Sequence, residues 1–260
     1  MIFSDTHCHI YSEQFDTDIS PIIQKATEAN VARFFLPNID MDYTNRLHDL
    51  SEKYPDQMFP MMGLHPCSVK DDYKDQLNQM EELLFNQKPV KYFAVGEIGI
   101  DLYWDKSFLE QQKDAFRTQV DWALKLGIPI VIHVRDAFAE IFELMDELYT
   151  PELKGVFHCF TGGKEEAEKI ISAYPTFKMG IGGVVTFKNS GLDSVVSEIP
   201  ISRIVLETDS PYLAPHPNRG KRNEPSYLLY IAEKVANIYS VSLEELSVIT
   251  EKNTNELFNL

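Results

Sequence analysis

Residues 128–133 read Ile-Pro-Ile-Val-Ile-His, an almost unbroken apolar run that ends in a side chain able to bind a metal. Such a run is typical of a strand in a parallel sheet whose two faces are both covered by helices. Residues 203–206, Arg-Ile-Val-Leu, have the same character. Each run is followed by an amphipathic stretch, so the local pattern is one strand and then one helix.

This strand-then-helix pattern occurs eight times along the 260 residues. We expect strands near 2–7, 32–37, 58–63, 91–97, 128–133, 154–158, 176–181 and 203–208. We expect helices near 19–30, 42–54, 72–87, 107–126, 136–148, 164–173, 189–198, 225–239 and 242–258. Eight alternations in about 250 residues predict an α/β fold, a (β/α)8 TIM barrel with an extra C-terminal helix, with residues 1–260 as a single domain. A doubly wound open sheet is the alternative.

Two of the expected helices begin with a capping signal. Ser107 with Glu110, and Ser242 with Glu245, have the spacing of a capping box. Gly127 is typical of the residue that follows a helix, so it predicts where the helix that starts near Ser107 ends.

The formal net charge of the chain is −16. This excess of acidic residues argues against a broad basic surface that coats nucleic acid. An enzyme that binds one phosphate locally remains compatible, because metal ions and a few arginines can reverse the potential inside a cleft. No apolar run approaches the roughly 18–20 residues that span a bilayer. Ligand-like residues follow Met1 almost at once, leaving no room for a signal peptide. We therefore expect a cytoplasmic protein with no membrane contact and no obligate protein partner.

The three cysteines, Cys8, Cys67 and Cys159, are odd in number and widely spaced, which argues against a disulfide framework. On a strand, Cys8 would face away from His7 and His9 because successive side chains alternate. We expect Cys8 to be a small buried packing residue.

Histidines and acidic residues gather where the expected strands end. They are Asp5, His7 and His9 on the first strand, His65 on the third, Glu97 on the fourth, His133 on the fifth, His158 on the sixth, and Glu207 and Asp209 on the eighth. Of the seven histidines, His48 and His216 lie elsewhere. The carboxyl ends of all strands meet at one rim of a (β/α)8 barrel, so these side chains are expected to line one pocket.

Imidazoles and carboxylates in one pocket are ligands for zinc, manganese and similar ions. His7 and His9, two apart on an extended chain, point the same way and can bind one ion together. Glu97 has two oxygens and can bridge two ions about 3.5–4 Å apart, which would ionise a water at neutral pH. Asp209 can bind metal and receive the proton of that water. Any one of these residues alone is also compatible with a structural role, His133 as a hydrogen-bonded core histidine for example.

The ordered set of motifs resembles the TatD family of metal-dependent deoxyribonucleases, within the wider amidohydrolase-like barrels. The matching segments are Asp5-Thr6-His7-Cys8-His9, Gly63-Leu64-His65-Pro66, Gly96-Glu97-Ile98-Gly99-Ile100-Asp101, His133-Val134-Arg135-Asp136-Ala137, His158-Cys159-Phe160-Thr161-Gly162, residues 207–215 (Glu-Thr-Asp-Ser-Pro-Tyr-Leu-Ala-Pro) and residues 218–225 (Asn-Arg-Gly-Lys-Arg-Asn-Glu-Pro). They run from the first residues to the terminal helix, and the main departure is Ile100 where leucine is commoner.

The resemblance implies two divalent metal ions, with Mg, Mn and Zn left open. One ion would be held by His7, His9, Glu97 and Asp209. The second would be held by Glu97, His133 and His158. The resemblance also implies that His65 contacts substrate phosphate or assists in acid–base steps, and that Asp101 and Glu207 orient the ligands.

Residues that suit nucleic acid lie in the loops beside this pocket. Arg219, Lys221 and Arg222 form the densest basic cluster and are candidates for binding phosphate; a solvated loop that balances an acidic protein is the alternative. Tyr103, Trp104 and Tyr212 follow the fourth and eighth strands and are candidates for stacking on unpaired bases, although loop aromatics also simply pack.

The leading hypothesis is hydrolysis of DNA phosphodiester bonds by a metal-activated water, with Asp209, Glu97 and His65 as catalytic residues. The resemblance implies a 3′-5′ exodeoxyribonuclease acting on single-stranded ends, a DNA repair type of activity. Two alternatives stay open. One is ester or amide hydrolysis, for example removal of a D-amino acid from tRNA, which the net charge of −16 favours slightly. The other is a non-catalytic metal-binding barrel.

Overall fold

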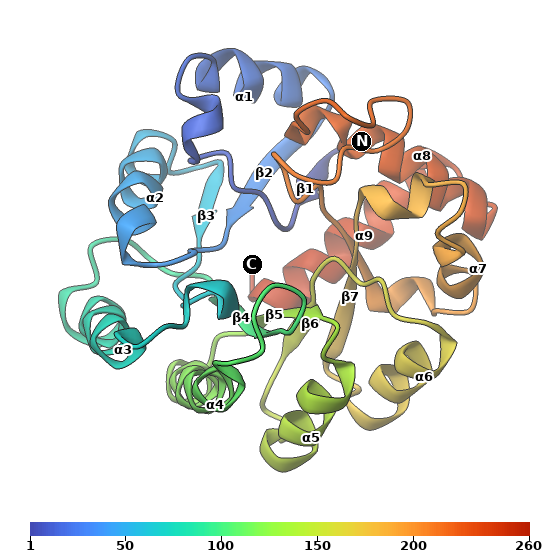
Figure 1. Cartoon of the computed structure of the whole chain (residues 1–260). Helices are drawn as coiled ribbons and strands as arrows, with labels where there is room; N and C mark the ends of the chain where they lie inside the picture. The colour runs from blue at the N-terminus through green and yellow to red at the C-terminus, as the bar shows by residue number, and fades with distance from the viewer.

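Eight parallel strands form a ring at the centre of the molecule and helices surround it (Figure 1). The computed structural model describes residues 1–260. The strands are β1 (Phe3–Asp5), β2 (Val31–Leu36), β3 (Met58–Pro60), β4 (Val95–Asp101), β5 (Ile130–Arg135), β6 (Gly155–Phe157), β7 (Phe177–Ile181) and β8 (Ile204–Leu206). The α-helices are α1 (Ile19–Glu28), α2 (Met41–Lys53), α3 (Tyr73–Glu82), α4 (Leu109–Leu126), α5 (Phe138–Leu148), α6 (Lys164–Ala173), α7 (Leu192–Val196), α8 (Leu228–Tyr239) and α9 (Leu243–Phe258).

The ring consists of two hydrogen-bonded ladders, β1–β3 and β4–β8, joined by backbone contacts at both junctions. Between β8 and β1, the N–H of Thr6 donates to the carbonyl of Leu206 at 3.0 Å. Between β3 and β4, the N–H of Gly96 donates to the carbonyl of Met62 at 3.0 Å. The predicted (β/α)8 barrel is therefore confirmed.

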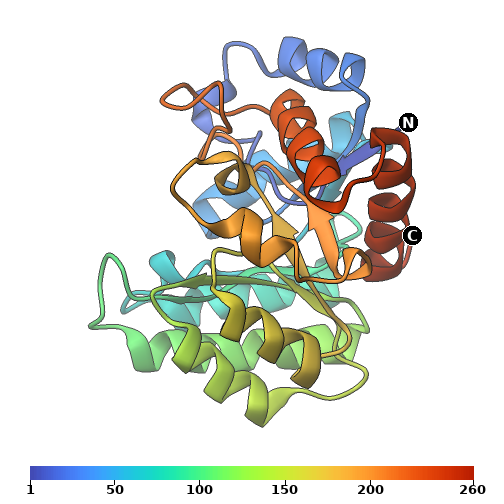
Figure 2. The same ribbon diagram turned by 90° about the vertical axis from the view of Figure 1, so that its right-hand side faces the viewer.

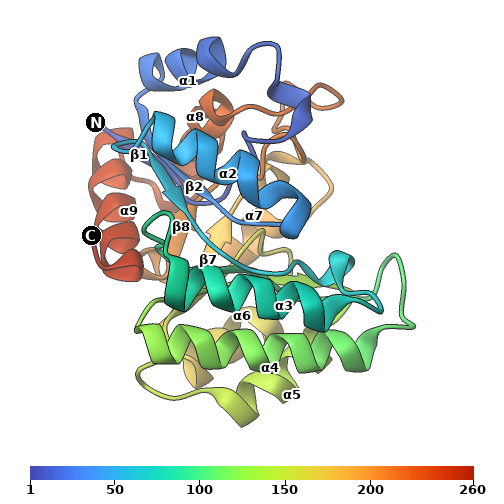
Figure 3. The ribbon, with the colours of Figure 1, turned by 90° about the vertical axis from the view of Figure 1, so that its left-hand side faces the viewer.

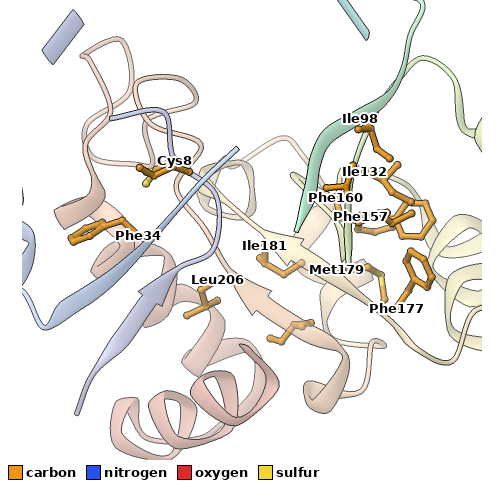
Figure 4. Close-up of a cluster of buried hydrophobic side chains, with 14 of the residues drawn as sticks. Cys8, Phe34, Ile98, Ile132, Phe157, Phe160, Phe177, Met179, Ile181 and Leu206 are labelled. Atoms are coloured by element: carbon orange, nitrogen blue, oxygen red, sulfur yellow. The ribbon is translucent and has the colours of Figure 1, made fainter. Parts of the chain in front are cut away.

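Side chains alternate across the barrel wall. Ile130 and Ile132 of β5 point outward into the large apolar cluster between strands and helices, part of which Figure 4 shows. Val131, between them, belongs to a second cluster inside the barrel. That inner cluster consists of Phe35, Met61, Ala94, Val131, Val156, Val205, Leu257 and Phe258. Cys8 is fully buried in the outer cluster, which confirms its predicted packing role.

Helix α9 closes the end of the barrel where the strands begin. It lies with both chain termini at one end of the molecule, whereas the loop after β4 projects at the other (Figures 2 and 3). The ring of Phe258 stacks on Phe35 of β2 with centroids 4.0 Å apart. Lys178 of β7 donates to Glu256 of α9 at 3.3 Å. Since apolar and paired polar groups fill this end, the opposite end of the barrel is where side chains of the strands can meet a substrate.

Most predicted elements are confirmed to within a few residues, but β4 (Val95–Asp101) begins and ends four residues later than the expected strand at 91–97. It continues to Asp101, so Glu97 lies inside the strand rather than at its end. Gly99, with φ of +152°, lies beside His133 of β5, and a Cβ there would come within 1.9 Å of the His133 carbonyl oxygen. A glycine is required for β4 and β5 to run side by side at this point.

Two helix predictions were wrong in detail. The helix expected at 189–198 is only α7, Leu192–Val196, because Gly191 takes a left-handed conformation (φ +67°) just before it. The capping box expected at Ser107 does not form; Ser107 donates to Asp105 instead and α4 begins at Leu109. The capping box of Ser242 is confirmed, since its hydroxyl accepts from the N–H of Glu245. None of the helices combines the length and apolar character that a bilayer crossing needs.

Candidate metal centre

The carboxylate of Glu97 lies at the centre of a group of buried imidazoles at the open end of the barrel. Its Oε2 atom is 3.1 Å from Nε2 of His7 and 3.6 Å from Nε2 of His9. The two imidazole nitrogens are 3.2 Å from each other. Oδ1 of Asp209 is 3.8 Å from His7 and 3.6 Å from His9. These four side chains form a first set of donor atoms.

The other oxygen of Glu97 faces a second set. Oε1 is 2.7 Å from Nδ1 of His133 and 2.8 Å from Nε2 of His158. One carboxylate therefore separates two groups of donors, with one oxygen turned toward each. The structure brings together all six residues that the sequence analysis assigned to metal binding.

The donor atoms fit divalent ions in spacing and in chemistry. Ligand atoms around a tetrahedral zinc, at about 2 Å from the ion, lie about 3.3 Å from one another. The first set, with separations of 3.1 to 3.8 Å, is close to that value. Two ring nitrogens that face each other beside two carboxylates are also an arrangement that a cation would satisfy better than a single hydrogen bond. Nitrogen-rich sets of this kind suit zinc, manganese and similar ions.

Two further carboxylates lie beside the imidazoles of the second set, and the one beside His133 is hydrogen-bonded to it. Oδ2 of Asp101 accepts from Nε2 of His133 at 2.9 Å, so Nδ1 is the atom turned to Glu97. Oε1 of Glu207 lies 3.5 Å from Nδ1 of His158. Partners of this type fix the ring orientation of metal-binding histidines.

The carboxylate of Glu207 occupies space that β7 leaves open. Gly180 of β7 faces it, and a Cβ at that position would lie 2.1 Å from Oε2 of Glu207. That oxygen is buried and has no hydrogen-bond partner. Strand β7 therefore contributes no metal-binding side chain, but the glycine at position 180 leaves the space that the Glu207 side chain fills.

Asp5 joins the first and last strands beneath the centre. Its Oδ1 accepts from the N–H of Thr208 at 2.8 Å, and its Oδ2 accepts from the Thr208 hydroxyl. Asp5 lies on the strand that carries His7, and Thr208 precedes Asp209. The contact therefore sets the two strands of the first donor set in register.

His65 differs from the other four histidines of the centre in its hydrogen bonding. Its Nδ1 accepts from the N–H of Cys67 at 3.0 Å, so the proton of the neutral ring is on Nε2. That Nε2 lies 3.3 Å from Oε1 of Glu97. A protonated nitrogen cannot bind metal but can donate a hydrogen bond, and the side chain is 15% exposed. The geometry suits the predicted contact with substrate.

Burial and mutual contact shift the acidities of these groups in opposite directions. Burial raises the pKa of Asp209 to about 8, with Glu97 and Glu207 adding to the rise. Burial also favours a raised pKa for Glu97, but His158, His65 and His7 outweigh it and hold that pKa well below its usual value. Burial lowers the pKa of His7 to about 4. The pKa of His158 is raised, because Glu97 and Glu207 outweigh the opposing effect of burial.

The three residues of the predicted basic cluster have different surroundings in the structure. Arg222 donates to both carboxylate oxygens of Asp18 and to a backbone carbonyl, so its hydrogen-bonding capacity is used within the protein. Lys221 is exposed. The guanidinium carbon of Arg219 lies 4.0 Å from the ring centroid of Phe187 and makes no ion pair. A phosphate contact stays a prediction for Arg219 and Lys221, whereas Arg222 would have to leave Asp18 first.

Exposed aromatic side chains stand beside the centre, as expected. Tyr103 and Trp104 are 52% and 71% exposed, and the guanidinium carbon of Arg135 lies 3.7 Å from the Tyr103 ring centroid. Tyr103 and Arg135 line a pocket of about 630 Å³. The ring of Tyr212 is 6.2 Å from that of His9. Arg135 was not among the predicted site residues, although it stands two positions after His133 on the same strand.

Comparison with known proteins agrees with this architecture. The model of the family described as TatD related DNase matches residues 4–259. The chain belongs to the TatD family. It is 39% identical to the uncharacterized metal-dependent hydrolase YabD of Bacillus subtilis, with all of both chains covered. It is 32% identical to a TatD protein of Pantoea vagans named as a 3′-5′ ssDNA/RNA exonuclease, covering 98% of this chain and 99% of that one. The crystal structure of the TatD homologue YjjV of Escherichia coli superposes with a TM-score of 0.92 at 28% identity, covering 99% and 98% of the two chains. Membership of this TatD family makes the protein a metal-dependent hydrolase.

Proposed function

We propose that this hydrolase is a phosphodiesterase that uses two metal ions to remove nucleotides from the 3′ end of single-stranded DNA. The observation that carries the proposal is the division of Glu97 between two sets of donors. Enzymes that cleave phosphodiesters commonly hold two ions with one bridging carboxylate, and this arrangement matches that need.

The residues of each set have a defined share in holding the ions. His7, His9 and Asp209 would bind one ion with Oε2 of Glu97, and His133 and His158 would bind the other with Oε1. Bound divalent ions supply Lewis acidity at the phosphate and lower the pKa of water. Because four of the donors are imidazoles, zinc or manganese suits the centre better than magnesium, which prefers oxygen ligands.

Two side chains are then available to accept a proton and to bind the substrate phosphate. The Oδ1 atom of Asp209 lies in the first donor set, 3.6 Å from Nε2 of His9, so we assign Asp209 to accept the proton that the attacking water loses. His65 presents an Nε2 proton to the same space, so it can donate to a phosphate oxygen.

The depth of the centre favours a strand end as substrate. Glu97 is 2% exposed and His7 is fully buried, so a rigid duplex would meet the rim before it met these atoms. A single strand can bend inward, and its unpaired bases can stack on exposed aromatics such as Tyr103, Trp104 and Tyr212. The printed activity of the Pantoea vagans relative agrees with this substrate class.

The test uses the purified chain with manganese or zinc and single-stranded oligonucleotides labelled at either end. A 5′-labelled strand should give a ladder of shortening products, which Glu97→Gln abolishes. Glu198→Gln is the matched control, because Glu198 is an exposed surface residue that pairs only with Lys164. Wild-type protein that leaves oligonucleotides intact would refute the nuclease assignment. Release of a D-amino acid from acylated tRNA under the same conditions would then identify the second candidate activity, which the net charge of −16 favours.

A further inference from the structure

A second pocket opens between the loops that follow β7 and β8, and Arg219 of the predicted basic cluster lines it. Its volume is about 440 Å³. The lining is polar and basic apart from one aromatic ring, and it includes Thr186, Lys188, Asn189, His216 and Arg219. Asn189 lies in the stretch where a helix was expected, and His216 is one of the two histidines that lie away from the expected strand ends.

The cations of this pocket differ from most others in the protein. Many of the lysines and arginines are paired with the abundant carboxylates, as Lys164, Lys234 and Arg222 are. Lys188 and Arg219 have no carboxylate within 4.0 Å. In a chain with a net charge of −16, two cations that line one pocket and have no carboxylate partner form a place that suits an anion.

The pocket walls are held in place by contacts between the two loops. The hydroxyl of Thr186 accepts from the N–H of His216 at 2.8 Å and donates to the carbonyl of Gly183 at 2.7 Å. The guanidinium of Arg219 rests on the ring of Phe187, at 4.0 Å from the centroid, so its N–H edge stays free. An arginine fixed by stacking loses little freedom when it binds a phosphate through two parallel hydrogen bonds.

The pocket and the metal centre lie on the same rim of the barrel. His216 follows Asp209 by seven positions, and seven residues span at most about 25 Å. Tyr212 stands between them in sequence, is 49% exposed and has its ring 6.2 Å from that of His9. A strand with its end at the metal centre can therefore pass Tyr212 and bring another of its phosphates to the pocket.

We infer that this pocket binds a backbone phosphate of the substrate strand, separate from the phosphate that is cut. The inference rests on the proposed nuclease function, since it assigns a subsite to that substrate. Lys188 and Arg219 would contact the phosphate, and His216 would add a hydrogen-bonding edge. The subsite makes the enzyme prefer polynucleotides over diesters that carry a single phosphate.

The decisive comparison is between a single-stranded oligonucleotide and bis(p-nitrophenyl) phosphate, which has only one phosphate. Lys188→Ala should lower kcat/KM for the oligonucleotide about tenfold relative to kcat/KM for bis(p-nitrophenyl) phosphate, since a charged hydrogen bond to the longer substrate is lost. The slope of log affinity against log salt should become less negative by about 0.7, the value for one phosphate contact on a single strand. Lys188→Arg should restore much of both. Lys91→Ala removes one charge just before β4, at the opposite end of the barrel, and should change neither.

A second measurement separates failure of the subsite from failure of the nuclease proposal. Inorganic phosphate, titrated into metal-free isotope-labelled protein, should shift the NMR signals of Lys188, His216 and Arg219 in the wild type and not in Lys188→Ala with Arg219→Ala. Absence of these shifts in the wild type would overturn the pocket as an anion site. Phosphate-induced shifts with an unchanged substrate ratio in Lys188→Ala would overturn the backbone assignment and leave a site for free phosphate. Shifts in a protein that cleaves neither diester would refute the nuclease and support the pocket alone.

Discussion

Replacing Asp101 with asparagine tests whether His133 is a metal ligand held in place by its neighbour. In the native protein, Oδ2 of Asp101 accepts from Nε2 of His133 at 2.9 Å and Oδ1 accepts from the N–H of Tyr103 at 3.0 Å. An amide has one acceptor oxygen for these two donors, so one of them loses its partner. The carboxylate is 2% exposed, so water cannot readily replace the lost bond.

The expected result is weaker binding of one ion only. Loss of a carboxylate that orients a metal-binding histidine lowers metal affinity about 10- to 100-fold, or about 1.4–2.7 kcal/mol. His7, His9 and Asp209 do not contact Asp101, so the other ion should keep its affinity. Titration of metal-free protein with zinc, against a fluorescent chelator, resolves the two dissociation constants.

Asp105→Asn is the matched control for this experiment. Asp105 lies four residues further on, in the loop after β4, has a side chain that is 43% exposed, and bonds only to Ser107 and Lys70. It should bind both ions like the wild type. If Asp101→Asn folds normally and both dissociation constants stay within about twofold of the wild-type values, His133 is not positioned by Asp101 for metal binding and the reasoning fails.

Three further outcomes follow from the structure. Phe258→Ala should lower the free energy of unfolding in urea by about 3–5 kcal/mol because it removes one of the eight side chains of the inner cluster and leaves a cavity; a loss below about 1 kcal/mol would show that the packing of Phe258 against the barrel contributes little to stability. Gly180→Ala should remove the second ion, measured by elemental analysis, because its Cβ would displace the Glu207 carboxylate; two ions per chain would contradict this. Metal affinity should fall as pH falls from 7 to 6, because contact with carboxylates raises the pKa of His133 and His158 against burial, and a metal must displace those protons. Calorimetry in buffers of different ionisation enthalpy counts the protons released, and a pH-independent affinity would exclude these two ligands.

Much of the fold was predictable because its signals are local. An apolar run such as residues 128–132 and the amphipathic stretch after it need no distant partner to be recognised. The predicted element boundaries were wrong where the backbone conformation or packing of a single glycine was not visible in the hydrophobic pattern. Gly191 shortened the expected helix at 189–198, and Gly99 allowed β4 to continue past Glu97. The effect of Gly191 depends on its left-handed backbone conformation, and that of Gly99 depends on close contact with the neighbouring strand.

The identity of the metal-binding candidates was also open to prediction, because residues at the ends of parallel strands share a rim whatever their distance in the chain. Their individual roles were not. That Nδ1 of His65 is occupied by the N–H of Cys67, and that each oxygen of Glu97 faces a different set, follows from side-chain directions in the folded chain.

The amino-acid order alone thus established the alternation of strands and helices and the set of residues that gather at one rim, since periodicity and strand polarity are properties of the chain itself. The partners of each charged side chain were settled by folding. Arg219 and Arg222 are three positions apart and chemically identical, yet one lies free in a pocket with Lys188 while the other is bound by Asp18. Electrostatic pairing depends on distances of a few ångströms between segments some two hundred residues apart, and spacing along the chain does not encode those distances.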